Sequence, residues 1–206
     1  MWNPLLAAYL PMDRLQALAT GRALREHSSG ATLLADLSGF TPLAEELARV
    51  LGPRRGAEEV ARQINAVYDA LLPQIRAYGG SVIDFAGDAM VGYFDEDDGL
   101  RATACALAMQ AAMGSFQALP LPTGAELALG LKVGIARGSV RRFLVGNPSI
   151  QCLEAMGGAP IVRMSAAEQQ ARRGEVLLDS DCALPLAHAL QVAEWRDAKG
   201  GRYARV

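Results

Sequence analysis

Apolar and polar residues alternate on both sides of a Gly-Asp step in the stretch Ser81 to Phe94, SVIDFAGDAMVGYF. Such alternation is typical of strands, and a glycine at the step supplies the backbone freedom of a tight turn. The stretch therefore predicts a β-hairpin with Gly87 and Asp88 at its tip. Asp88 is either a solvated turn residue or a functional carboxylate, and the hairpin taken alone favours the solvated residue.

A second carboxylate ends an apolar strand upstream of the hairpin. The run ATLLAD stops at Asp36, and a helix is predicted from Thr41, where Thr41 is a cap and Pro42 suits the first helical position. Free backbone amides at the start of a helix favour an anion, typically phosphate. The residues that line this connection are Leu37, Ser38, Gly39, Phe40 and Thr41.

The rest of the chain carries helical and strand patterns in succession. Helical spacing covers residues 3–24, interrupted by Pro11, and then residues 57–78, 100–116 and 159–172. Residues 126–147 predict two long strands joined near Arg137 and Gly138, and further strands are predicted at residues 149–156, 174–179 and 189–206. This order predicts an α+β fold in which helices flank one central, mostly antiparallel sheet. We expect residues 1–29 to be a helical lead-in and residues 30–206 to be one domain.

Composition and charge narrow the classes of partner. A chain of 206 residues with 51% hydrophobic residues supports one sizeable core. The formal net charge of −2 argues against nucleic acid, and no apolar run is long enough to span a membrane. Three cysteines without CxxC spacing suggest neither a zinc site nor a disulfide framework, which predicts a cytoplasmic protein.

Asp36 and Asp88 would meet if their strands are neighbours in the sheet. Both carboxylates would then project from the same end, beside the amides of Leu37 to Thr41. Two carboxylates next to an anion-binding helix start are the parts of two-metal phosphoryl chemistry, for which magnesium is the natural ion.

Three strings resemble the catalytic domain of class III nucleotidyl cyclases: ADLSGFTPLAEEL, FAGDAMVGYF and LKVGIARGSVRRFLVG. The resemblance covers residues 30–180 and implies the ferredoxin-like cyclase sandwich. It also implies that Asp36 and Asp88 bind two Mg²⁺ ions, or Mn²⁺ or Ca²⁺, and that ATP is converted to cyclic AMP and pyrophosphate. The nucleotide would be held by Leu37 to Thr41 and by Gly87. The segments YLPMDRLQALATG and LEAMGGAPIVRMSAAEQQARRGEVLLD are most similar to the first cyclase domain of the soluble, bicarbonate-responsive adenylyl cyclases.

The departures from the family pattern concern the other half of the site. The position of the base-reading Lys is Asp84, and the positions of the Asn and Arg that stabilise the transition state are Ile161 and Ser165. Because class III sites form at a dimer interface, a second cyclase domain, in tandem or in trans, would supply these groups, and a homodimer is expected to be nearly inactive. The alternative is a degenerate cyclase-fold module that binds nucleotide or dimerises to regulate a neighbour.

Three arginines near the predicted strand turn are the remaining candidates for chemistry. Arg137, Arg141 and Arg142 either contact phosphate, as an Arg in this region does in family members, or mark a solvated strand end. The sequence favours the solvated strand end.

Overall fold

The computed structural model describes residues 10–206 except residues 122, 125, 148–149 and 199. Its helices are α2 (Met12–Ala19), α3 (Phe40–Leu51), α4 (Pro53–Ala77), α5 (Leu100–Ala112), α6 (Ala159–Gln170) and α7 (Ser180–Ala183), with short 3₁₀ segments η1 (Met113–Phe116) and η2 (Leu184–Leu186). Its strands are β1 (His27–Ser38), β2 (Ser81–Ala86), β3 (Ala89–Asp95), β4 (Leu119–Pro120), β5 (Glu126–Leu127), β6 (Gly130–Asn147), β7 (Gln151–Gly157), β8 (Val176–Asp179), β9 (Glu194–Ala198) and β10 (Gly201–Arg205).

One large sheet organises the molecule. Its strands lie in the order β2-β3-β1-β6-β8-β10-β9, and β7 pairs with β6. The pair β6 and β8 is parallel, and the other pairs of this sheet are antiparallel. The predicted α+β fold with a mostly antiparallel central sheet is therefore confirmed.

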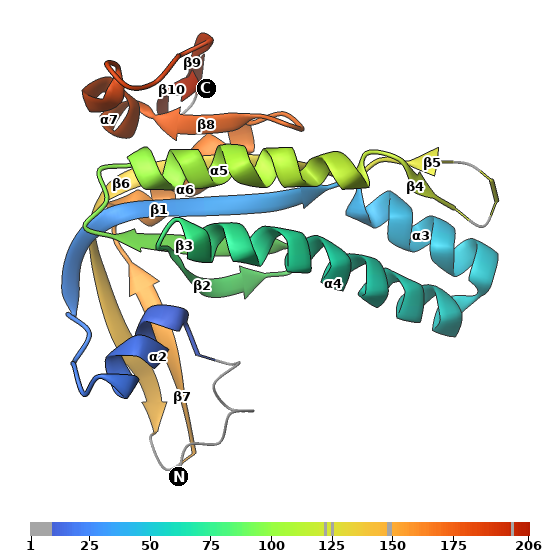
Figure 1. The fold of residues 1–206 in the computed structure, drawn as a ribbon, viewed down its shortest axis with the longest axis horizontal. Helices are drawn as coiled ribbons and strands as arrows, with labels where there is room; N and C mark the ends of the chain where they lie inside the picture. The colour runs from blue at the N-terminus through green and yellow to red at the C-terminus, as the bar shows by residue number, and fades with distance from the viewer. Residues whose placement is uncertain (1–9, 122, 125, 148–149, 199) are drawn as a thin grey trace.

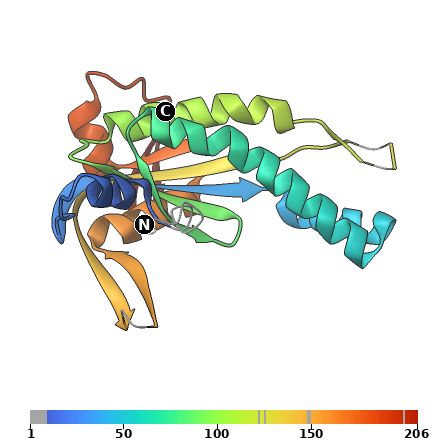
Figure 2. The same ribbon diagram turned by 60° about the horizontal axis from the view of Figure 1, so that its bottom comes forward.

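Helices cover both faces of the sheet. The alternation of side chains along β1 shows which residues point to each face. Figure 2 shows α4 and α5 above the sheet and α6 below it. Ala31, Leu33 and Ala35 are fully buried in the core that includes residues of α4 and α5. Because side chains alternate along a strand, Thr32 points to the other face, where its hydroxyl donates to the carbonyl of Pro160 in α6. Asp36 shares this second face with Thr32.

The predicted hairpin and helices appear close to their expected positions. β2 and β3 are joined by the turn at Gly87 and Asp88, and Gly87 has a φ of 68°. α3 begins one residue before the predicted Thr41. α4 begins at Pro53 rather than at Ala57, because proline is well suited to the first helical turn.

The region predicted as two strands near Arg137 and Gly138 is one continuous strand, β6, so that prediction was wrong. Arg137 pairs with Ala31 and Gly138 with Gly30, and the chain does not reverse there. β6 stays paired with β1 as far as Arg141, and from Arg141 to Asn147 it pairs with β7 in a projecting hairpin (Figure 1). We call the two paired segments, residues 141–147 and 151–157, the arm. Gly138 has a φ of 151°, a conformation that other residues rarely adopt, and it lies three residues before the arm begins.

The predicted helical lead-in lies partly within the described residues. Residues 3–9 of the predicted helical stretch lie outside the described residues. In the remainder, α2 ends at Ala19, so Leu24 is not helical. α2 contacts the edge of the sheet, where the backbone amide of Asp13 donates to the Ser81 hydroxyl at 2.9 Å. Among the helices of residues 10–206 that the structure describes, none has the length and apolar character required to cross a membrane.

Gly134 in β6 allows α6 to approach the sheet closely. A Cβ at this position would lie 2.3 Å from the Met164 carbonyl oxygen and 2.4 Å from the Glu168 amide nitrogen, both in the backbone of α6. We expect Gly134→Ala to lower the free energy of unfolding by about 1–3 kcal/mol or more, because the helix backbone must move. Urea unfolding tests this, with Gly92→Ala in β3 as the control.

The control position is also a glycine in a buried part of the sheet. A Cβ at Gly92 would meet its nearest atom, in Ile75, at an ordinary 3.6 Å. Gly92→Ala should therefore change stability much less than Gly134→Ala. Equal losses in the two variants would show that the close approach of α6 is not the cause.

Candidate functional site

Asp36 lies near the end of the central strand β1. Its neighbours across the sheet are Ala89 in β3 and Lys132 in β6. The side chain of Asp36 is 25% exposed, so water and solutes reach its carboxylate.

The strands that carry Asp36 and Asp88 are neighbours, as the sequence required for the two carboxylates to meet. Since Asp36 pairs with Ala89, Asp88 is the residue that immediately precedes the cross-strand partner of Asp36. The turn at Gly87 leaves open space where a Cβ would be, so glycine serves the backbone conformation there and not close packing. The register therefore brings both residues to the same end of the sheet.

α4 packs against the tip of this hairpin. The rings of Tyr68 and Phe85 meet edge to face, with their centroids 5.2 Å apart. Burial raises the pKa of Tyr68, and the nearby Asp88 carboxylate raises it further. The Tyr68 hydroxyl is buried and has no hydrogen-bond partner among the described residues. A buried donor is thus available beside Asp88.

The connection from β1 to α3 combines packing with free polar groups. Leu37 is buried in the core, whereas Gly39 has a φ of 91° and precedes the first residue of α3. The amide of Leu43 bonds to the Gly39 carbonyl, but those of Phe40 and Thr41 precede the first bonded turn. The Ser38 hydroxyl is buried without a hydrogen-bond partner in the described part of the chain. An anionic ligand would satisfy these donors.

Lys132 and Glu168 are residues of this site that sequence reasoning missed. The Lys132 ammonium lies 2.7 Å from Asp36 Oδ2 and also contacts Glu168 of α6. Burial lowers the pKa of Lys132, but the two carboxylates outweigh burial and raise it overall. Lys132 alternates with apolar residues in the string LKVGIA, which placed it on the opposite face from the core, but nothing in the string indicated its partners.

The three positions that depart from the family pattern, Asp84, Ile161 and Ser165, differ in their exposure to solvent. Asp84 is exposed at an irregularity in the β2–β3 pairing, and its carboxylate accepts from the Phe85 amide at 2.8 Å. Ile161 and Ser165 lie on α6 and are half-buried. None of the three places a positive charge at the sheet end occupied by Asp36.

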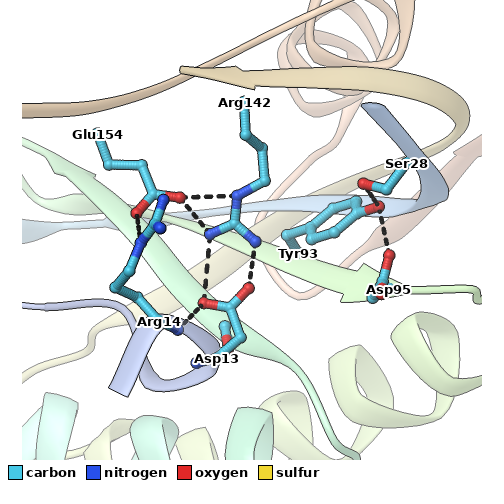
Figure 3. Close-up of polar contacts among 8 residues, drawn as sticks. Asp13, Arg14, Ser28, Tyr93, Asp95, Arg142 and Glu154 are labelled. Atoms are coloured by element: carbon cyan, nitrogen blue, oxygen red, sulfur yellow. Dashed lines mark hydrogen bonds and ion pairs between the residues drawn. The ribbon is translucent and has the colours of Figure 1, made fainter. Parts of the chain in front are cut away.

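Arg142 is neither a solvated residue nor a free phosphate ligand, so both sequence interpretations are wrong for it. The side chain is 4% exposed and forms ion pairs with Asp13 of α2 and Glu154 of β7 (Figure 3). Glu154 is in turn bonded to Arg14, with 3.0 Å between Arg14 Nε and Glu154 Oε2. Arg142 also lies over the ring of Tyr93, 5.9 Å from its centroid. These charges join α2 to the arm.

The other two arginines have separate surroundings. Arg141 is exposed and pairs with Glu26, which agrees with the solvated strand end. Arg137 donates to the Asp181 carbonyl oxygen at 3.2 Å.

The oxygen-bearing residues around Asp36 and Asp88 suit a hard divalent cation, provided that ligands from outside the chain complete its coordination. Among the described residues, no group of three or more His, Cys, Asp or Glu side chains is arranged to hold a metal by itself. Asp36 and Asp88 provide carboxylate oxygens. The Ser38 hydroxyl, which has no hydrogen-bond partner among the described residues, and the amides of Phe40 and Thr41 follow Asp36 along the chain. Oxygen ligands from water and from a phosphate would therefore have to complete the shell of a Mg²⁺ ion here.

Solved structures with the same fold define its class. The adenylyl cyclase CyaB from P. aeruginosa superimposes with a TM-score of 0.73 at 20% identity, covering 89% of this chain and 96% of that one. The guanylyl cyclase Cya2 gives a TM-score of 0.72 at 23% identity over 87% of this chain and 92% of that one. A bacterial light-regulated adenylyl cyclase gives 0.77 at 18% identity over 98% of this chain and 58% of that one. The chain has the fold of a class III nucleotidyl cyclase catalytic domain.

Within that class, the sequence is similar to adenylate cyclase type 10, which confirms the resemblance seen in the motifs. The rat protein (Rattus norvegicus) is 23% identical over 156 residues, which are 74% of this chain and 10% of the relative. The human protein (Homo sapiens) is 22% identical over 181 residues, 86% of this chain and 11% of the relative. The chain thus spans about a tenth of the length of these curated relatives. No family model matches the sequence.

Proposed function

We propose that this chain is the metal-binding half of an adenylyl cyclase, which forms cyclic AMP and pyrophosphate from ATP together with a complementary cyclase domain. The observation that carries the proposal is the register of β1 and β3, which puts Asp36 opposite Ala89 and therefore beside the turn that holds Asp88. The two carboxylates would hold two Mg²⁺ ions, or Mn²⁺ or Ca²⁺ in their place. When bound, the ions supply activation of the attacking ribose hydroxyl and neutralisation of the leaving phosphate.

The protein's own contribution is to bind and orient the triphosphate. The amides of Phe40 and Thr41 point from the start of α3 and would donate to phosphate oxygens. The Ser38 hydroxyl would gain the partner it lacks among the described residues. Gly87 keeps the hairpin tip tight, so that Asp88 stays beside Asp36 when substrate binds.

A complementary domain would supply what this chain lacks. Asp84, Ile161 and Ser165 stand where a base-reading Lys and a transition-state Asn and Arg are expected from the family resemblance. Each absent donor to the transition state is worth on the order of 100-fold to 1,000-fold in rate. A homodimer of this chain would lack them in both of its sites and should be nearly inactive.

A second function, from a different class, has its own support. The ammonium of Lys132 already neutralises Asp36, in a site that also lacks the base-reading and transition-state residues. These features favour a degenerate cyclase-fold module that binds nucleotide, or dimerises, and regulates a neighbouring domain.

The boundaries and the cellular compartment are part of the proposal. We place the cyclase domain at residues 30–206 and a lead-in at residues 1–29, in which α2 is the helix that the structure describes. Cys105 and Cys182 are buried free thiols, and burial raises the pKa of each to about 12. Unreactive free thiols suit a reducing compartment, which supports a cytoplasmic protein.

Reconstitution separates the two functions. The chain is mixed with a class III cyclase domain that carries the Lys, Asn and Arg at the complementary positions, and cyclic nucleotides formed from ATP or GTP are measured by mass spectrometry. We expect cyclic AMP from the mixture and little from either domain alone. If sedimentation shows that the two domains associate and no cyclic nucleotide forms, the enzyme proposal is wrong and the regulatory module is favoured.

A further inference from the structure

Asp36, Lys132 and Glu168 form a line of alternating charge across one face of the sheet. Asp36 and Lys132 are direct cross-strand partners on β1 and β6, so both side chains point to the same face. That face is covered by α6, which carries Glu168. The Lys132 ammonium lies between the two carboxylates and contacts both.

The two carboxylates differ in their access to water. The side chain of Asp36 is 25% exposed, whereas that of Glu168 is 9% exposed. The close approach of α6 over Gly134 brings Glu168 down onto Lys132, which lies on the same face. Glu168 therefore depends on Lys132 for its neutralisation, whereas Asp36 can also be neutralised from solution.

We propose that Lys132 is a built-in cation that occupies Asp36 and must withdraw to Glu168 before a divalent ion can bind there. This inference rests on the proposed metal role of Asp36. An ammonium on Asp36 Oδ2 opposes a divalent ion at the same carboxylate, because the two positive charges repel each other at close range. Lys132 thus weakens metal binding, and Glu168 limits that weakening by offering the ammonium a second acceptor.

The three variants of a double-mutant cycle give this inference a distinctive signature. Lys132→Met removes the competing ammonium and should tighten Mn²⁺ binding about tenfold. Glu168→Gln leaves Lys132 with Asp36 alone and should weaken binding several-fold. In the double variant K132M/E168Q no ammonium competes for Asp36, so the loss of Glu168 has no further effect. The Mn²⁺ affinity of the double variant should therefore match that of K132M.

A simple sum of charges predicts a different result for the double variant. Losing one positive and one negative charge would return the affinity to that of the unmodified chain, since independent effects add. The double variant also avoids a buried, unpaired Glu168, so the comparison survives if K132M alone does not fold. Arg54→Met, which removes an exposed positive charge from α4, is the matched control and should change the affinity less than twofold.

The experiment titrates the full chain with Mn²⁺ and follows the free ion by electron paramagnetic resonance. A double variant that binds about tenfold more tightly than the unmodified chain supports the inference. A double variant with unchanged affinity overturns it and leaves the metal role of Asp36 intact. Absence of Mn²⁺ binding in every variant overturns both. A lysine effect on Mn²⁺ without cyclic AMP formation in the reconstituted mixture overturns the enzyme proposal alone.

Discussion

Replacing Asp36 or Asp88 by asparagine is expected to lower cyclic AMP formation by the reconstituted domains about 1,000-fold or more. An amide keeps the shape of the carboxylate but loses the negative charge that holds a divalent cation near a triphosphate. Because the register places both residues at one end of the sheet, each substitution should have an effect of similar size. Initial rates at saturating Mg²⁺ and ATP measure the loss.

The control for these variants is another carboxylate on the same molecule. Asp69 is exposed on α4, and Asp69→Asn should leave the rate within twofold of the unmodified chain. Circular dichroism establishes that the variants are folded, since Asp36→Asn also removes a partner of Lys132. Full activity of folded D36N and D88N variants would rule out the proposed metal role of both residues.

Replacing Arg142 by methionine is expected to lower the free energy of unfolding by about 3–5 kcal/mol, the usual effect of breaking a buried ion pair. The substitution leaves the buried Glu154 with Arg14 alone and leaves Asp13 without its guanidinium partner (Figure 3). Methionine preserves much of the packing volume, so most of the loss comes from the uncompensated charge. Urea unfolding monitored by tryptophan fluorescence measures the change.

The neighbouring arginine is a matched control for Arg142. Arg141 lies on the opposite face of β6, and its pair with Glu26 is exposed to solvent. Arg141→Met should leave the unfolding midpoint nearly unchanged, because exposed pairs contribute little. If the two substitutions had equal effects, burial of the Arg142 pairs would not matter for stability.

The Arg142 ion pairs also couple the stability of α2, in the lead-in, to that of the arm. Asp13 and Arg14 belong to α2, whereas Arg142 and Glu154 belong to the arm. Loosening α2 would leave the arm with buried charges that lack partners, so we expect R142M to speed hydrogen exchange in both segments. The lead-in is thus held to the domain that begins at residue 30 by the ion pairs of Asp13 and Arg14 with the arm.

Much of the fold was predictable because local patterns and the observed elements agree. The alternation in β2 and β3 and the Gly-Asp step determined the hairpin, and the Thr-Pro pair determined the start of α3 within one residue. The error at Arg137 and Gly138 arose because a glycine after a polar residue resembles a turn. The strand continues through these residues, since first β1 and then β7 supply hydrogen-bond partners to β6.

The candidate site was predictable only where its residues lie in recognisable strings. Asp36, Asp88 and the loop that connects β1 to α3 belong to such strings. Lys132 and Glu168 also lie in strings that resemble the family, but those strings did not indicate that the two side chains meet. The two residues are 36 positions apart and meet only because α6 crosses β6 at Gly134. Arg142 was misread for the same reason, because its partner Asp13 lies 129 positions away.

The sequence by itself determined the class of fold, the hairpin that carries Asp88 and the strand end that carries Asp36, because periodicity and turn chemistry act over neighbouring residues. Only the tertiary structure decided which charges meet. Sheet register placed Asp36 beside Lys132, and helix packing brought Glu168 to the same ammonium. Register and packing depend on the whole core, so no local pattern could have revealed that the proposed metal ligand already has a cation of its own.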